Sequence, residues 1–315
     1  MQLEKLDQLV KYMSSHLYTL SQGAGLLAKR NKCTIDDVKL AKRIVRNEMG
    51  SIIKKESNVK VPKILIFDIE TAPMKAYVWS MWKDSVPLDR VISDWFIICW
   101  SAKWLYDNDI MGDCLTSKEA LEENDYRVCK SLYDLINEAD IVVAHNGDRF
   151  DIPKINARFI INGFEPPKPY ISVDTCAVAK KQFGFASNKL DALAGYFGFK
   201  PKLKTDFNLW KECLYGNQES LSYMLKYNKQ DVKLLEEVYL KLRPWMKNHP
   251  NYANFLDSKI PLCSKCGSNK LEEIKDKYYY TQVGKYQLYR CKDCGAIVRG
   301  RKTLNKEIKT TGAIH

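Results

Sequence analysis

The sequence predicts a central α/β domain between a small helical module and a cysteine-rich module. Three runs in the middle of the chain are almost entirely apolar, which is typical of strands buried on both faces of a sheet. Segments that fit helices follow these runs, and a mixture of strands and helices indicates the α/β class. The predicted strands are 63–71, 95–100 and 141–146, and the predicted helices are 151–164, 188–197 and 219–243.

Local signals fix several of these boundaries. The helix at 151–164 opens at Asp151 and tolerates Pro153 in its first turn, whereas Pro244 ends the long helix at 219–243. Segments 50–62 and 244–262 contain prolines and no clear period, so we expect two linkers. The predicted domains are 1–58, 60–245 and 259–303.

Length and composition bound the class of protein. The 315 residues, 45% hydrophobic and 28% charged, allow two or three globular domains and exclude a disordered or collagenous chain. No apolar run reaches the roughly 18 to 20 residues that span a bilayer, and the first residues lack the apolar core of a signal peptide. We therefore expect a cytoplasmic protein with no membrane partner.

The charge is concentrated at the two ends of the chain. The net charge is +12, with 12 Lys/Arg against 6 Asp/Glu in residues 1–60 and 13 against 5 in residues 259–315. The residues between carry 25 against 27, which leaves that part free to hold a carboxylate-rich site. Basic flanks favour an acidic ligand such as nucleic acid, although solubility alone would also explain them.

The N-terminal module, 1–58, fits three helices with a helix-turn-helix-like corner near residues 31–33. Lys39, Arg43 and Arg46 share the face of its last helix that lies opposite the apolar stripe. These side chains would contact DNA in one interpretation and would be a solvated helix face in the other.

Carboxylates occur at three separated places in the central domain. Asp68 and Glu70 are two residues apart on a predicted strand, so they point to the same face. Asp151 begins a helix, where it would also suit an N-cap, and Tyr227 and Asp231 share a helical face at i, i+4. A tyrosine in the core and an aspartate on the surface would fit that last pattern as well. Four converging acids would repel one another unless divalent cations lay among them.

These segments resemble the three motifs of the DEDD (DnaQ-like) exonuclease superfamily, in order. Phe67 to Thr71, Asn146 to Asp151 and Tyr227-x-x-x-Asp231 are similar to its DEDDy branch, which includes the proofreading domains of family B DNA polymerases. The resemblance implies a ribonuclease H-like mixed sheet flanked by helices and the release of nucleoside monophosphates from a 3′ end. The resemblance favours DNA, in single-stranded form, over RNA as substrate.

The resemblance also assigns roles to individual residues. Asp68, Glu70, Asp151 and Asp231 match the ligands of two Mg²⁺ or Mn²⁺ ions, and Tyr227 matches the residue that orients the attacking water. Asn146 and Phe150 correspond to substrate-contacting positions. An exoribonuclease, an endonuclease or strand-transfer enzyme, and a non-catalytic DNA-binding regulator remain alternatives.

Tryptophans are frequent after the first strand. They would either line a channel for a single strand or fill the core, and the positions are Trp79, Trp82, Trp95, Trp100 and Trp104.

The C-terminal module contains two Cys-x-x-Cys pairs, each followed by glycine. Four thiolates suit a closed tetrahedral zinc site, and the segment between the pairs fits a hairpin that turns near Gly284. The module resembles a zinc ribbon with one structural Zn²⁺, and a redox pair is the alternative. Arg299 and Arg301 are candidates for contacts to phosphates. The predicted ligands are Cys263, Cys266, Cys291 and Cys294.

Overall fold

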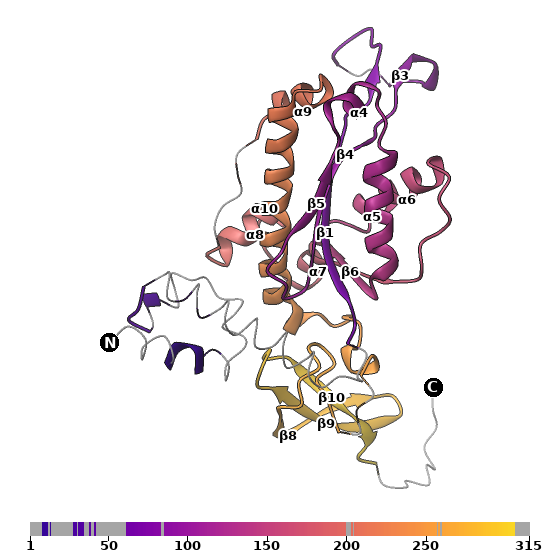
Figure 1. The fold of residues 1–315 in the computed structure, drawn as a ribbon. Helices are drawn as coiled ribbons and strands as arrows, with labels where there is room; N and C mark the ends of the chain where they lie inside the picture. Colours follow the sequence, from indigo (N-terminus) through magenta and orange to yellow (C-terminus); the bar gives the residue numbers. More distant parts are fainter. Residues whose placement is uncertain are drawn as a thin grey trace. The chain divides into compact units, whose positions relative to one another are not determined.

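The computed structural model divides the described chain into two compact units (Figure 1). One contains Lys63–Tyr196 and Lys200–Glu237, and the other contains Met1–Pro62, Phe197–Phe199 and Val238–His315. The described residues are 8–11, 13, 28–29, 31–34, 38, 41, 61–82, 85–199, 203, 205–256, 258 and 260–305. Lys39, Arg43 and Arg46 lie outside them, as does most of the predicted helical module.

A five-stranded mixed sheet forms the centre of the first unit. Its strand order is β5-β4-β1-β6-β7, with β1 and β4 antiparallel, β4 and β5 antiparallel, and β1, β6 and β7 parallel. The predicted mixed α/β fold is therefore confirmed. The strands are β1 (Ile64–Thr71), β4 (Ile97–Trp104), β5 (Met111–Cys114), β6 (Ile141–Ala144) and β7 (Ile171–Asp174).

Helices cover both faces of this sheet. Figure 1 shows α5 (Tyr126–Glu138) and α6 (Asp151–Ile161) on one side and α10 (Gln218–Leu242) on the other. Side chains of all three helices, including Leu132, Phe159 and Met224, belong to one buried cluster with the strands. The shorter helices are α4 (Ser117–Leu121), α7 (Thr175–Gln182), α8 (Leu190–Tyr196) and α9 (Phe207–Leu214).

After β1 the chain forms a small hairpin of β2 (Lys75–Ala76) and β3 (Val91–Ser93), with a 3₁₀ turn, η2 (Leu88–Arg90), before β3. Trp79 and Trp82 lie in the connection and are 88% and 80% exposed. Trp100, in contrast, is buried in the sheet and donates its indole N–H to the carbonyl oxygen of Val128. Trp79 and Trp82 are therefore exposed to solvent, whereas Trp100 is part of the core.

The buried Asp125 carboxylate ties α5 and α6 to β4. It accepts the N–H of Ile97 at 2.9 Å, two hydrogen bonds of 2.7 Å from the Arg158 guanidinium and one of 3.0 Å from Asn162. Burial alone would raise the pKa of Asp125, but these bonds outweigh it and lower the pKa. The ion pair thus fixes α6, the helix that begins at Asp151.

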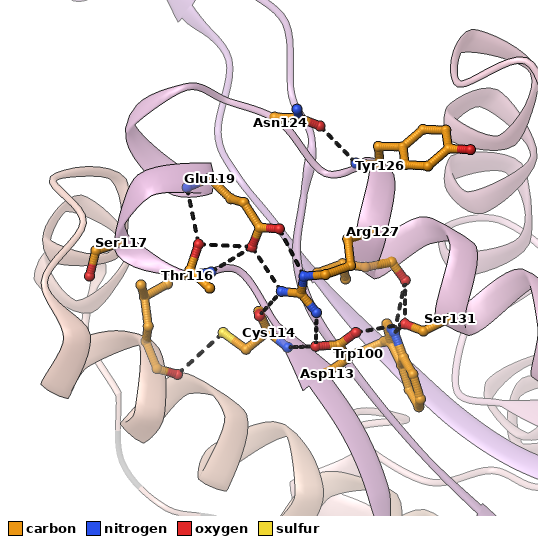
Figure 2. Close-up of polar contacts among 12 residues, drawn as sticks. Trp100, Asp113, Cys114, Thr116, Ser117, Glu119, Asn124, Tyr126, Arg127 and Ser131 are labelled. Carbon is orange, nitrogen blue, oxygen red and sulfur yellow. Dashed lines mark hydrogen bonds and ion pairs between the residues drawn. The ribbon is translucent and has the colours of Figure 1, made fainter.

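A second polar network fixes the edge strand β5, as Figure 2 shows. The Arg127 guanidinium donates to Asp113, to the carbonyl oxygen of Cys114 and to Glu119. Thr116 and Glu119 form a capping box that begins α4. The hydrogen bonds from Arg127 are the largest cause that lowers the pKa of Glu119 to about 2. All these acceptors serve Arg127 or a cap, so this cluster is structural.

The second unit contains a three-stranded antiparallel sheet in the order β10-β9-β8. Its strands are β8 (Leu271–Thr281), β9 (Gly284–Cys291) and β10 (Ile297–Thr303). The turn between β8 and β9 consists of residues 282–283, next to Gly284 as the sequence predicts.

The segment 244–262 is not the plain linker that its prolines predict. It contains two 3₁₀ turns, η3 (Arg243–Trp245) and η4 (Tyr252–Asn254), and buries Met246, His249 and Tyr252. The Tyr239 hydroxyl lies 2.7 Å from His249 Nε2, and burial lowers the pKa of His249 to about 3. Prolines prevent a regular helix here, but the aromatic side chains between them supply the packing.

No described helix combines the length and the apolar character that a bilayer-spanning segment requires.

Candidate metal and nucleic-acid site

The register of β1 and β4 sets the direction of the first two carboxylates. Asp68 is paired with Ser101 and Glu70 with Cys99, and directly opposed residues share a face of an antiparallel pair. Lys103, two residues along β4 from Ser101, pairs with Glu236 of α10. Asp68 and Glu70 therefore point toward the face of the sheet that α10 covers.

Helix α10 brings the third carboxylate to the same place. One oxygen each of Asp68, Glu70 and Asp231 lie within 4.8 Å of one another, and Asp231 is buried. Tyr227, one turn earlier on α10, is partly buried against the core. The helix approaches the sheet closely at Gly112, where an added Cβ would lie 2.9 Å from side-chain atoms of Leu225 and Lys229.

Two buried polar residues that the sequence does not single out surround Asp68. The Asn228 amide donates a 2.7 Å hydrogen bond from Nδ2 to Oδ2 of Asp68, across 160 residues of sequence. Asn228 Oδ1 and the hydroxyl of Ser101 are buried, and neither has a hydrogen-bond partner within the described part of the chain. Unsatisfied oxygens beside three carboxylates fit a hard divalent cation such as Mg²⁺ or Mn²⁺, which prefers oxygen ligands.

Asp151 lies beside the group rather than within it. The 4.8 Å cluster does not include its carboxylate, and Asp151 Oδ1 accepts the backbone N–H of Ile69, between Asp68 and Glu70, at 3.3 Å. Burial is the largest cause that raises the pKa of Asp151 to about 7. The structure thus brings three of the four expected ligands together and holds the fourth against the same strand.

The loop before α6 has a constrained backbone. Asn146 has a φ of +67°, and its N–H donates to Oδ1 of Asp174 at 2.9 Å. Gly147 approaches Ala144 so closely that an added Cβ would lie 2.4 Å from the alanine Cβ. A non-glycine residue with a left-handed backbone conformation, such as Asn146, is sterically costly and is often found at functional sites. The loop ends at Phe150, which is 39% exposed and therefore not a core residue.

A cavity of about 560 Å³ begins where β1 ends. Lys154 of α6 lies in its wall with the ammonium group 3.5 Å from the ring centroid of Trp95 and 5.2 Å from that of Phe150. No motif in the sequence marks Phe207 and Trp210 of α9 as functional. Only Asp206, which caps that helix, signals its presence. The walls consist of Thr71, Ala72, Pro73, Met74, Trp95, Lys154, Thr205, Asp206, Phe207 and Trp210.

The four cysteines of the second unit converge as predicted by their spacing. Cys263 Sγ lies 3.7 Å from Cys294 Sγ, and Cys266 Sγ lies 3.6 Å from Cys291 Sγ. Zinc–sulfur bonds of about 2.3 Å in a tetrahedron would separate the sulfurs by about 3.8 Å. Hydrogen bonds from Cys263, then Cys266 and Cys294, lower the pKa of Cys291 and favour its thiolate. The donor set and its dimensions suit Zn²⁺.

Comparison with known proteins agrees with the topology. Residues 107–243 match the family described as RNase_H superfamily. The matched segment contains β5, α5, β6, α6, β7 and α10, whereas β1 and β4 precede it. The match includes Asp151, Tyr227 and Asp231, whereas Asp68 and Glu70 precede it. Together with the acidic cluster, this match supports a nuclease.

Among solved structures, the chain is similar to the family B DNA polymerase from the hyperthermophilic archaeon Pyrobaculum calidifontis. The similarity has a TM-score of 0.44 and 18% sequence identity, and it covers 58% of this chain and 25% of that polymerase. The chain thus spans about a quarter of the polymerase. A comparison with curated protein sequences finds no match.

Proposed function

We propose that this chain is a metal-dependent 3′-to-5′ exonuclease that releases nucleoside monophosphates from single-stranded DNA. The observation that carries the proposal is the convergence of Asp68 and Glu70 on β1 with Asp231 on α10 within 4.8 Å. The preference for a 3′ end and for DNA rests on the three-motif resemblance, in which Tyr227 accompanies Asp231.

In the proposed site, Asp68, Glu70 and Asp231 would hold two Mg²⁺ ions, and Asp151 would supply a further oxygen from its place beside Ile69. When bound, the ions activate a water and stabilise the departing oxygen. Tyr227 orients that water toward phosphorus. A bond forms between the water oxygen and phosphorus as that water gives a proton to solvent. The bond from phosphorus to the 3′ oxygen breaks, and the 3′ oxygen takes a proton from solvent.

The cavity at the end of β1 suits the terminal nucleotide of the substrate. Trp95, Phe207 and Trp210 offer aromatic surface for a base, and Lys154 offers a cation to a phosphate. Partial burial lowers the pKa of Lys154. The side chain is still partly exposed where it lines the cavity wall. Asn146 and Phe150, in the constrained loop before α6, are proposed to contact the same end of the strand.

The flanking modules are proposed to bind metal or nucleic acid. Cys263, Cys266, Cys291 and Cys294 would hold one structural Zn²⁺. Arg299 and Arg301 are on β10 with exposed side chains, where phosphates can reach them. Lys39, Arg43 and Arg46 remain candidates from the sequence alone.

The test follows products from 5′-labelled DNA and RNA strands with Mg²⁺, using the full chain. We expect a ladder of single-nucleotide steps on DNA that Asp68→Ala and Asp231→Ala both abolish. Asp134→Ala is the matched control, because this exposed acid on α5 pairs only with Lys130 among the described residues. Tyr227→Phe should slow turnover and spare binding.

Other outcomes separate the alternatives. A ladder on RNA alone would identify an exoribonuclease, and binding without cleavage would identify a regulator. Internal cuts would indicate an endonuclease. Cleavage that survives in Asp68→Ala and Asp231→Ala would contradict the proposed site.

A further inference from the structure

The outer half of the three-stranded sheet in the second unit combines exposed aromatic rings with an excess of positive charge. Residues 277–288 and 297–303 contain five cations and no acidic residue. The ion pairs of this sheet, Lys270–Asp293 and Lys292–Glu272, lie at its other end, next to the cysteine pairs. A surface of this charge attracts a polyanion. The five cations are Lys277, Lys285, Arg299, Arg301 and Lys302.

Two tyrosines and one arginine form a connected group on one face of this half. Tyr279 of β8 is directly opposite Tyr286 of β9, so their side chains share a face. The Arg299 guanidinium lies 4.4 Å from the ring centroid of Tyr286 and 5.4 Å from that of Tyr279. These cation–π contacts hold a planar cation beside an aromatic ring that is 47% exposed.

The other face of the same sheet is partly occupied by the unit's own packing. Tyr289 and Val298, which are paired with each other across β9 and β10, pack against the four-cysteine cluster. Tyr289 is an odd number of residues from Tyr286 along β9, so it points to the opposite face. The face of Tyr279, Tyr286 and Arg299 therefore points away from the metal-binding core.

We infer that Tyr279, Tyr286 and Arg299 form a stacking surface for the bases of single-stranded nucleic acid, with the neighbouring cations contacting its phosphates. Aromatic rings bind bases of any sequence because every base has a π-face, and arginine adds cation–π attraction. Charge complementarity favours a polyanion over a protein partner. This binding surface is separate from the acidic site, and the inference does not depend on the proposed cleavage.

The test measures binding of fluorescein-labelled dT20 by the full chain, without added divalent metal so that no strand is cut. Tyr279→Leu should weaken binding at least about fivefold and up to about 150-fold, the range for one lost stacking contact. Tyr279→Phe should retain the affinity of the unmodified chain, because the ring is kept. Tyr280→Leu is the matched control, since Tyr280 is next in the strand, points to the other face and is 67% exposed.

A 20-unit abasic strand separates stacking from charge, because it keeps the phosphates and lacks the bases. It should bind more weakly than dT20 and should not distinguish Tyr279→Leu from the unmodified chain. Lys277→Gln should reduce the salt dependence of binding to both strands by about 0.7 in the logarithmic slope, because Lys277 is two residues from Tyr279 on β8 and shares its face. Circular-dichroism melting of each variant checks that the sheet is folded.

Three results would overturn the inference. The first is equal affinity for dT20 and the abasic strand. The second is an equal loss in Tyr279→Leu and Tyr280→Leu in folded variants. The third is no binding of either strand, which would leave this face to a protein partner. Because no cleavage is measured, a negative result for the stacking surface is distinguishable from a negative result for the proposed exonuclease activity.

Discussion

Replacing Asn228 by alanine should weaken metal binding at the acidic site without changing a single carboxylate. The Asn228 amide is fully buried and donates a 2.7 Å hydrogen bond to Asp68 Oδ2. A hydrogen bond to a charged group contributes about 1.5 to 3 kcal/mol, which corresponds to a factor of about 10 to 150. Residues that orient metal ligands typically contribute about 10- to 100-fold in affinity or activity. We therefore expect Mn²⁺ affinity to fall by about 10- to 100-fold in Asn228→Ala.

The assay is calorimetric titration of the full chain with Mn²⁺, with strand cleavage at saturating metal as a second readout. Asn217→Ala is the matched control, because Asn217 directly precedes the same helix and its Oδ1 accepts the N–H groups of Glu219 and Ser220 at 3.0 and 3.1 Å. Loss of this cap should cost about 1 kcal/mol of stability and leave Mn²⁺ affinity unchanged. If Asn228→Ala binds Mn²⁺ as tightly as the Asn217 variant, the amide does not position Asp68.

Three further predictions concern the supports of the site. Gly147→Ala should lower both the melting temperature and the cleavage rate, because its Cβ would lie 2.4 Å from that of Ala144; the double variant with Ala144→Gly should recover both. Asp125→Ala should lower the urea unfolding free energy by about 3 to 5 kcal/mol by leaving Arg158 unpaired, measured by tryptophan fluorescence. Since the folded pKa of Asp125 is lowered, this difference should be complete above about pH 4 and shrink as pH falls through the folded pKa. A zinc chelator should unfold the four-cysteine sheet, with about one Zn²⁺ released per chain; no bound zinc before chelation would contradict the assignment.

The local part of the site could be predicted from the sequence because its spacing is local. Asp68 and Glu70 end an apolar run, and the two-residue strand period places both on one face. Tyr227 and Asp231 lie one turn apart on a helix whose length the sequence also indicates. The four cysteines could also be predicted as metal ligands, because each Cys-x-x-Cys pair is a local turn that places two thiolates on one metal.

The contacts between distant segments could not be predicted. Asn228 is adjacent to Tyr227 in sequence, but its role depends on β1 lying under α10, which no local pattern reveals. Phe207 and Trp210 resemble ordinary residues of an amphipathic helix until α9 is seen beside the end of β1. The raised pKa of Asp151 is likewise a consequence of burial by elements from the whole domain.

Repulsion among the carboxylates of the acidic site destabilises the fold. A buried ion pair close to the site opposes this repulsion. Two carboxylate charges at 4.8 Å, the upper limit of separation in this cluster, would repel by about 3.5 kcal/mol at an effective dielectric constant of about 20, and three such groups meet here. Without cations, other interactions must hold β1 and α10 together against this repulsion. The Lys103–Glu236 ion pair joins β4 to α10 on the same face of the sheet, two residues from Ser101, and both partners are buried. Breaking such a buried pair is costly, so it resists the separation that the carboxylates favour. The carboxylates that would bind metal are thus held close together by contacts that take no part in the chemistry.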